Sequence, residues 1–211
     1  MLKSMKKNGA VLALFALACT SVVAVTHAVT ADRIAKQEQQ QLLKIINQLL
    51  PEEGHDNDIF NSCKLLTDET FLGSSEPQKV FTATQNGQIV GYAIEGIAPN
   101  GYNGKIKLVV GVDTQSEVTG VRILAHNETP GLGDKVEHRK SDWIDDFVGL
   151  SLTESNAHTW AVIKDGGDFD SFTGATITPR AVVGSVKNIL TYYNASQLSD
   201  LASAPSCWSK S

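Results

Sequence analysis

The sequence has few cysteines, few prolines and no long run of basic residues, and each scarcity excludes a class of protein. Three cysteines in 211 residues, with no Cys-x-x-Cys pair, are too few for a disulfide scaffold or a zinc module. Nucleic-acid-binding domains carry basic patches, but this chain has 18 basic against 23 acidic residues, so we expect no nucleic acid partner. With 6 prolines and 42% hydrophobic residues, the chain is neither disordered nor collagen-like. One globular domain of ordinary composition is what remains.

The one long apolar run lies at the N-terminus. Lys3, Lys6 and Lys7 precede an uncharged stretch over 8–31, and about 21 residues are enough to cross a hydrocarbon core as a helix. Lysines before the run and an acidic body after it predict that the N-terminus is cytoplasmic and the body exported. The alternative is a signal peptide cleaved after Ala31. We favour a retained anchor because the run exceeds the roughly 7–15 residues of a signal core.

Export bears on the two cysteines outside this run. An oxidising compartment permits a disulfide between Cys63 and Cys207. We predict this bridge, which would tie the C-terminal tail to the region after the first helix, and two free thiols are the alternative.

The exported body begins as a helix and continues as short strands. Apolar residues at helical spacing predict a stalk helix over Asp32–Leu50, which Pro51 ends. The hydrophobic period then changes to two, and Asn86-Gly87 is a strong hairpin signal. Four strands are expected, over Val80–Thr84, Ile89–Ile97, Lys105–Val112 and Val118–Ala125. Consecutive short strands with tight turns predict an antiparallel meander.

The C-terminal part of the body is expected to be mixed. We predict a helix over Lys135–Phe147, a strand over Trp160–Ile163 and a last helix that begins at Pro179 and has one apolar face. The fold class is therefore α+β, with a transmembrane helix and stalk followed by one domain in which helices flank an antiparallel sheet. We place the cytoplasmic tip and anchor at 1–31, the stalk and connecting region at 32–76 and the domain at 77–211.

The segment from Asp170 to Pro179, DSFTGATITP, is the one that suggests chemistry. Thr178 is expected to cap the last helix, with Pro179 as its first residue. The free N–H groups and the positive dipole end of a helix start can bind a phosphate, and Arg180 could add a counter-charge. Taken alone, however, these residues favour an ordinary loop followed by a capped helix.

A resemblance changes this interpretation. The pattern Asp170-x-x-Thr173-Gly174-Ala175-Thr176 resembles the acceptor motif of proteins that carry FMN in phosphoester linkage to a threonine. The stretch Glu128-Thr129-Pro130-Gly131-Leu132-Gly133 is similar to a second segment of the same proteins. Together with the apolar N-terminus and the meander, the whole chain resembles the RnfG (RsxG) family, the G subunits of the Rnf (Rsx) electron-transport complexes.

This resemblance implies an FMN-binding domain with the flavin attached covalently to Thr176. A separate exported flavin transferase, which uses FAD and magnesium, would make the bond. Thr173 and Thr178 would lie beside the phosphate, with Gly174 and Ala175 allowing close approach. The wall of the site beside the flavin ring would be formed by Glu128, Thr129 and Leu132.

The predicted role is electron transfer in an ion-translocating complex. The chain would be a single-pass protein of the bacterial cell inner membrane, with its C-terminal domain in the periplasm and other membrane subunits as partners. It would act as an electron carrier within a translocase, not as a stand-alone catalyst, so no catalytic residue and no metal ligand is assigned.

Three alternatives stay open at this point. The C subunit of a sodium-translocating NADH:quinone oxidoreductase shares the acceptor motif, although it is usually longer between its anchor and its flavin domain. A membrane-anchored binding or assembly module without a cofactor is the second alternative. The third is an exported hydrolase that uses Asp168 or Asp170.

Overall fold

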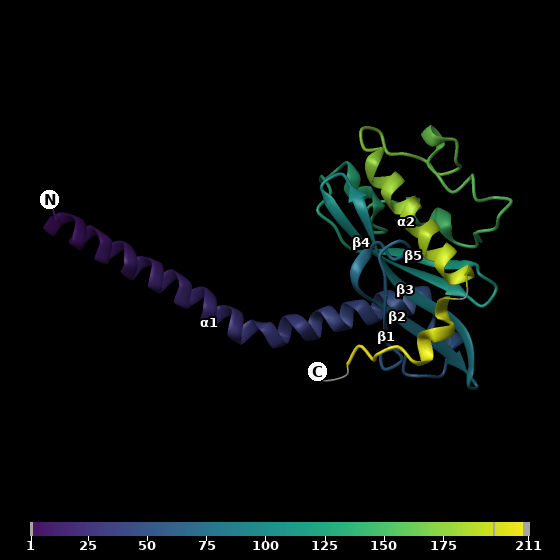
Figure 1. Cartoon of the computed structure of the whole chain (residues 1–211), viewed down its shortest axis with the longest axis horizontal. Helices are drawn as coiled ribbons and strands as arrows, with labels where there is room; N and C mark the ends of the chain where they lie inside the picture. The colour runs from purple at the N-terminus through teal and green to yellow at the C-terminus, as the bar shows by residue number, and fades with distance from the viewer. Residues whose placement is uncertain (1, 196, 209–211) are drawn as a thin grey trace. The chain divides into compact units, whose positions relative to one another are not determined.

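The structure, a computed structural model, describes residues 2–195 and 197–208 and divides into two compact units, of which the second begins at Lys44. The first unit is the greater part of α1 (Leu2–Leu49), a helix of 48 residues (Figure 1). Within it, Met5–Ala31 is long and apolar enough to cross a membrane. The apolar run and the stalk are thus one helix, which ends just before Pro51.

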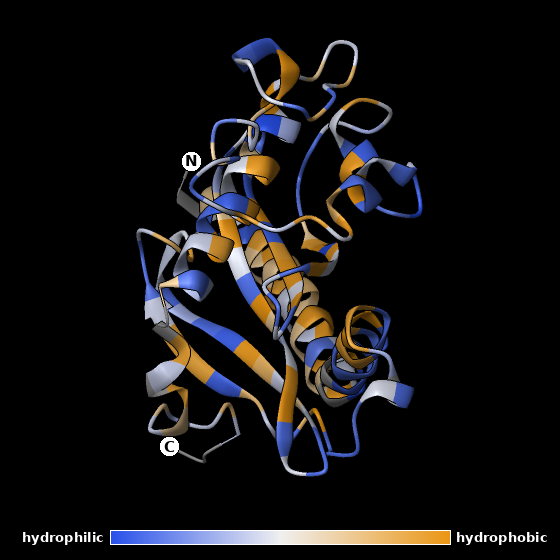
Figure 2. Cartoon of the chain, turned by 90° about the vertical axis from the view of Figure 1, so that its right-hand side faces the viewer, coloured by the Kyte–Doolittle hydropathy of each residue, from blue (hydrophilic) through white to orange (hydrophobic). Residues whose placement is uncertain are grey.

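The second unit is built on a five-stranded antiparallel sheet whose strands follow one another in chain order. The strands are β1 (Lys64–Asp68), β2 (Ser74–Gln85), β3 (Gln88–Gly101), β4 (Gly104–Asp113) and β5 (Val118–Ala125). The predicted meander and the α+β class are confirmed, and Asn86 and Gly87 form the β2–β3 turn with positive φ angles of 52° and 76°. Hydrophobic and hydrophilic residues alternate along parts of these strands, as Figure 2 shows, whereas residues 108–112 of β4 are all buried.

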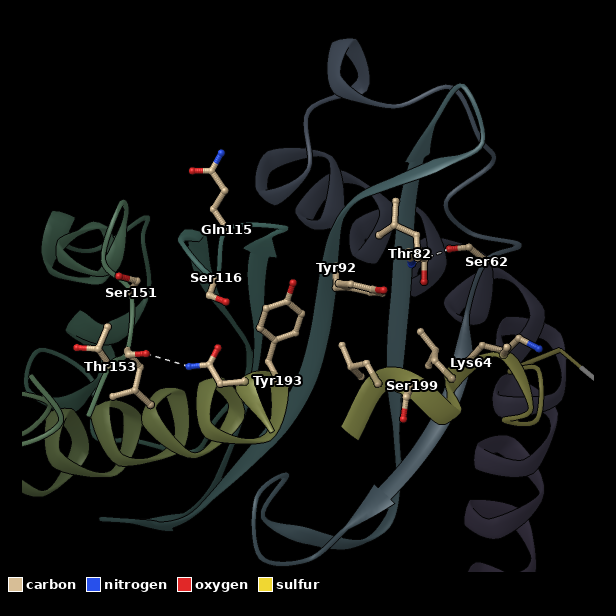
Figure 3. A pocket seen from close by; sticks show the side chains of 16 residues that line it. Ser62, Lys64, Thr82, Tyr92, Gln115, Ser116, Ser151, Thr153, Tyr193 and Ser199 are labelled. Carbon is tan, nitrogen blue, oxygen red and sulfur yellow. Dashed lines mark hydrogen bonds between the residues drawn. The ribbon is translucent and has the colours of Figure 1, made fainter. Parts of the chain in front are cut away.

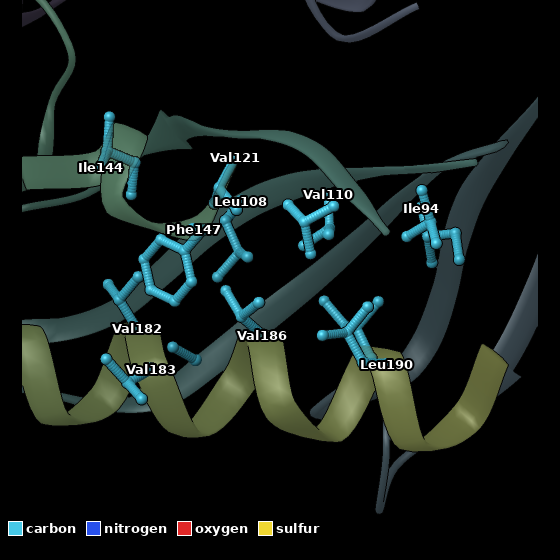
Figure 4. Packing of buried hydrophobic residues seen from close by; sticks show 14 of the residues in the cluster. Ile94, Leu108, Val110, Val121, Ile144, Phe147, Val182, Val183, Val186 and Leu190 are labelled. Carbon is cyan, nitrogen blue, oxygen red and sulfur yellow. The ribbon is translucent and has the colours of Figure 1, made fainter. Parts of the chain in front are cut away.

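The main core lies between one face of this sheet and α2 (Ile177–Asn194). Buried residues recur along α2 at helical spacing, and Figure 4 shows Val182, Val186 and Leu190 facing the side chains of the sheet. Phe147, which is fully buried, fills the space over β4 and β5. The predicted last helix is therefore confirmed, and its apolar face fixes it on the sheet.

The last turn of α1, within the second unit, covers part of the other face of the sheet. Ile46 and Leu49 are fully buried there. A Cβ at Gly111 would lie 2.9 Å from the Cβ of Leu49, and one at Gly120 would lie 2.8 Å from its Cδ2. Glycine at these two positions lets the helix approach the strands, so this end of α1 is part of the domain.

Two predictions of secondary structure are wrong. In place of a helix over Lys135–Phe147 there are two 3₁₀ turns, η2 (Gly133–Val136) and η3 (Asp142–Phe147). Ser141 is extended and accepts a bond from the N–H of Trp143 at 3.2 Å, which starts η3 as a separate turn. The predicted strand at Trp160–Ile163 is reduced to a single bridge between Val162 and Phe169, followed by η4 (Ile163–Asp165).

The C-terminal tail returns to the edge of the sheet. The predicted disulfide is confirmed, since Cys63 and Cys207 are bonded with their Cα atoms 5.5 Å apart. Beyond η5 (Gln197–Ala202), the tail also pairs with β1, where the N–H of Leu65 donates to the carbonyl of Pro205 at 2.9 Å. The tail therefore covers a strand edge that would otherwise expose unpaired backbone groups.

Candidate functional site

The acceptor-like motif forms a tight turn immediately before α2. The N–H of Ala175 donates to the carbonyl of Phe172 at 3.0 Å, which leaves Thr173 and Gly174 exposed at the tip. Gly174 has a φ of 81°, a conformation that residues with a side chain rarely adopt. The turn is thus a glycine-dependent loop with the Thr173 side chain at the surface.

Buried aromatic side chains pack against the segment that leads into this turn. The ring of Phe172 contacts Trp143 edge-on with centroids 5.2 Å apart, and Phe169 stacks on Phe147 at 4.5 Å. Trp143 also donates from its indole Nε1 to the carbonyl of Asp170 at 2.9 Å. Because these partners are buried, the backbone before α2 is held in one conformation while the tip of the turn faces solvent.

Thr176 stands directly before the first residue of α2, yet its hydroxyl does not cap the helix. Its φ and ψ of −73° and −29° are helical, whereas a capping residue is usually extended, and its side chain makes no capping bond. The third residue of α2 is Pro179, which has no N–H to donate to such a cap. The Thr176 hydroxyl instead accepts a bond from Nζ of Lys164 at 2.8 Å.

The predicted cap at Thr178 is wrong. α2 begins at Ile177, so Thr178 lies inside the first turn and Pro179 is the third helical residue. Proline is tolerated there because the first N–H groups of a helix have no intrahelical partner. Thr178 is fully buried, and its hydroxyl donates to Oε2 of Glu128.

Glu128 joins the two motifs that the resemblance singled out. Glu128 is only 5% exposed, and its Oε1 accepts from the N–H of Asn103 at 3.0 Å while its Oε2 accepts from Thr178. A Cβ at Gly133 would lie 2.8 Å from the Thr178 hydroxyl and 2.9 Å from Glu128 Oε2. The glycine of the second motif is therefore needed for this buried contact between segments 50 residues apart.

The remaining residues of the second motif form a turn beside the first. The carbonyl of Thr129 accepts bonds from the N–H groups of Leu132 and Gly133, both at 3.1 Å. Leu132 is 42% exposed, and its Cδ2 would lie 3.7 Å from a Cβ on Gly174. Leu132 and Gly174 thus lie together at the surface, and Thr129 is exposed beside them.

Charged side chains surround Thr176 in an arrangement that the sequence did not indicate. Arg180, the expected counter-charge for a phosphate, is paired with Asp165 and donates to its Oδ1 at 2.9 Å from one terminal nitrogen. This pairing lowers the pKa of Asp165 and raises the pKa of Arg180. Lys164 is the cation at the Thr176 hydroxyl. It lies 12 residues upstream in η4, and no spacing rule connects the two positions.

Two cavities lie along α2, at different distances from this turn. A cavity of about 970 Å³ lies near Tyr92, Tyr193 and Ser199, as Figure 3 shows. At 1.5 Å per helical residue, Tyr193 is about 25 Å from Thr176, so this cavity is separate from the motif. A second cavity of about 250 Å³ is lined by Ile177 and Arg180 from α2 and therefore adjoins Thr176. Within 2–195 and 197–208, no three His, Cys, Asp or Glu side chains gather as a metal site.

The buried bond between Thr178 and Glu128 gives a test of this geometry. Thr178→Val keeps the shape but leaves one carboxylate oxygen of Glu128 buried without that donor, so we expect a loss of about 1–3 kcal/mol in the free energy of unfolding. Thr191→Val is the matched control, because the Thr191 hydroxyl donates only to the carbonyl of Lys187 in the same helix. Urea denaturation followed by tryptophan fluorescence measures both. Equal midpoints for Thr178→Val and wild type would contradict the assignment.

Comparison with known proteins agrees with the motifs. The family model for the RnfG N-terminal region matches residues 1–49, and the model for the FMN-binding domain matches residues 101–191. The G subunit of the ion-translocating oxidoreductase complex of Shewanella baltica (strain OS223) is 55% identical over 193 residues, which cover 92% of this chain and 91% of that protein.

Two further relatives carry the same name. The protein of Aliivibrio fischeri (strain ATCC 700601 / ES114) is 52% identical over 93% of this chain and 94% of its own length. That of Vibrio atlanticus (strain LGP32) is 52% identical over 98% of this chain and 99% of its own length. The resemblance seen in the motifs is thereby confirmed. With an RnfG N-terminal region and an FMN-binding domain, the chain belongs to the RnfG family, the G subunits of ion-translocating oxidoreductase complexes.

Proposed function

We propose that this chain is a membrane-anchored electron-transfer protein that carries FMN in phosphoester linkage to Thr176. The observation that carries the proposal is the Thr176 hydroxyl, which stands at a helix start without capping it and accepts a bond from Lys164. FMN, when bound, supplies one- and two-electron redox chemistry, and the protein holds and orients it.

The residues around Thr176 fit a phosphate and a flat apolar ring. The N-terminus of α2 and the Lys164 ammonium provide positive charge beside the hydroxyl. Gly174 and Ala175 have little side chain to obstruct the backbone, and the exposed hydroxyl of Thr173 can donate to a phosphate oxygen. Leu132, which is 42% exposed, offers apolar surface to a ring on the side of the second motif.

Thr176 suits the attachment better than its two neighbouring threonines. Thr178 is fully buried and its hydroxyl is engaged by Glu128, so its oxygen is closed to a large reactant. Thr173 lies at the exposed tip of the turn, away from the first residue of α2. Thr176 alone of the three combines partial exposure with a bonded cation.

The remaining parts of the proposal concern place and partners. Met5–Ala31 would anchor the chain in the bacterial inner membrane, and the lysines before it favour a periplasmic C-terminal domain. The bond between Cys63 and Cys207 supports an oxidising compartment. The name of the relatives supports other membrane subunits as partners, and a flavin transferase would attach the cofactor. That name also favours the RnfG assignment over the C subunit of a sodium-translocating NADH:quinone oxidoreductase.

Production of the full chain with and without an active flavin transferase tests this function. Only a covalent flavin survives denaturation, so a denaturing gel should show a fluorescent band in the first sample and a dark band in the second. A dark band in both, with the transferase shown to modify another substrate, would contradict the proposal. That outcome would favour the anchored module without a cofactor.

A further inference from the structure

We propose that Lys164 is the positioning residue for attachment of FMN to Thr176. Its ammonium group orients the threonine hydroxyl for the reaction and afterwards balances the charge of the phosphodiester. This inference rests on the proposed function, because it concerns how the same threonine is modified.

The geometry of the hydroxyl is the first support. Nζ of Lys164 lies 2.8 Å from Oγ1 of Thr176, a normal distance for a hydrogen bond from an ammonium group. An ordinary threonine before a helix would give this oxygen to a helical N–H, but the third position of α2 is Pro179. Pro179 removes one of the two N–H groups that such a cap can use, and the helical φ and ψ of Thr176 go with a side chain that makes no capping bond. The hydroxyl is therefore available, and Lys164 fixes its direction.

The placement of Lys164 is built into the fold. Asp165, the residue after Lys164, accepts hydrogen bonds from two nitrogens of the Arg180 guanidinium. This pair connects η4 to the first turn of α2. At the other end of the turn, the N–H of Ile163 donates to the carbonyl of Phe169 at 2.8 Å. A Cβ at Gly167 would lie 2.0 Å from the carbonyl oxygen of Ala161, so only glycine allows this compact return. Lys164 is thereby held next to Thr176 by contacts on both sides.

The chemical step needs such a cation. Oγ1 of Thr176 forms a bond to the FMN phosphorus of FAD, the pyrophosphate bond to the AMP half breaks, and AMP leaves. The hydroxyl proton passes to a base of the transferase, so atoms and charge balance without any oxidant or reductant. Negative charge develops on Oγ1 as its proton leaves, and a cation already bonded to that oxygen stabilises it.

The same position serves the product. The phosphodiester carries one negative charge, and its non-bridging oxygens lie one bond beyond the phosphorus attached to Oγ1. A cation bonded to Oγ1 is therefore within reach of one of them. Because Arg180 is already paired with Asp165, Lys164 is the cation that balances the charge of the phosphodiester.

The test measures the initial rate of FMN attachment to the purified full chain in detergent, with transferase, FAD and magnesium. The initial rate with Lys164→Met should be lower than with wild type by about tenfold or more. We expect this loss to stay below the roughly 100-fold effect of a donor in a water-excluded site, because solvent screens Lys164. Lys164→Arg should keep most of the rate. Lys44→Met, which removes an exposed lysine from the end of α1, is the matched control and should react like wild type.

A second readout separates positioning from folding. Thermal melting of the unloaded variants should stay near that of wild type, because Lys164 is exposed. In loaded protein, the phosphorus NMR shift of the diester should move in Lys164→Met and not in Lys44→Met. Attachment to Lys164→Met or Lys164→Gln at the wild-type rate would overturn the inference, as would a Lys164→Arg rate as low as that of Lys164→Met. A dark wild-type chain would instead remove the proposed function itself.

Discussion

Thr176→Val, produced together with an active flavin transferase, should carry no covalent FMN, whereas Thr176→Ser should keep it. A phosphoester requires a side-chain hydroxyl, and valine has the shape of threonine without one. The Thr176 hydroxyl is partly exposed and bonded to an exposed lysine, so its loss should change the free energy of unfolding by less than about 1 kcal/mol. In-gel flavin fluorescence after denaturation should therefore fall to background in a folded protein.

Thr173→Val is the control for this experiment, because it removes a hydroxyl from the same turn. It should retain the fluorescent band, since the ester oxygen of Thr176 is still present. A fluorescent Thr176→Val band beside a dark Thr173→Val band would show that the ester is on Thr173 instead. Fluorescence in Thr176→Val and Thr173→Val alike, with the double variant also fluorescent, would point to a third site.

The second large effect concerns the disulfide. Replacing both Cys63 and Cys207 by alanine should lower the free energy of unfolding by up to about 5 kcal/mol, because the bridge closes a loop between residues 144 apart. Cross-linking so long a loop removes much conformational freedom from the unfolded chain. The bond also keeps the tail paired with β1, and Trp208 stacks on Phe60, just before that strand, with ring centroids 4.1 Å apart.

Urea denaturation of the full chain, with and without a reductant, measures this effect. Reduced wild type and the double variant should unfold at similar, lower urea concentrations than oxidised wild type. Cys19→Ala is the matched control, since Cys19 is an exposed, free cysteine and its replacement should leave the midpoint unchanged. Equal midpoints for oxidised wild type and the double variant would contradict the stabilising role.

Local sequence patterns predict most of the fold but not its long-range contacts. The four strands β2 to β5 follow from their period of two and from the Asn86-Gly87 turn. β1 escapes prediction because it has only five residues, none of them fully buried, and it pairs with both β2 and the distant tail. The helix expected over Lys135–Phe147 is two 3₁₀ turns, since apolar residues three or four apart suit both forms.

In the candidate site too, local patterns predict the backbone elements but not the contacts between distant residues. The glycine turn and the helix after it follow from the motif, but Thr178 and Pro179 are not the cap and first helical residue that their types suggest. The Thr178 hydroxyl is engaged by Glu128 across 50 residues, and no local pattern records such a contact. Lys164 escapes prediction for a similar reason, because the turn at η4 brings it to Thr176.

Mass spectrometry of the intact, denatured chain and of its Thr176 peptide tests the central claim most directly. Protein made with an active flavin transferase should be heavier than the unmodified chain by the mass of FMN less one water. Fragmentation should place that mass on Thr176. An unmodified mass in protein from cells with active transferase, or the added mass on any other residue, would contradict the account.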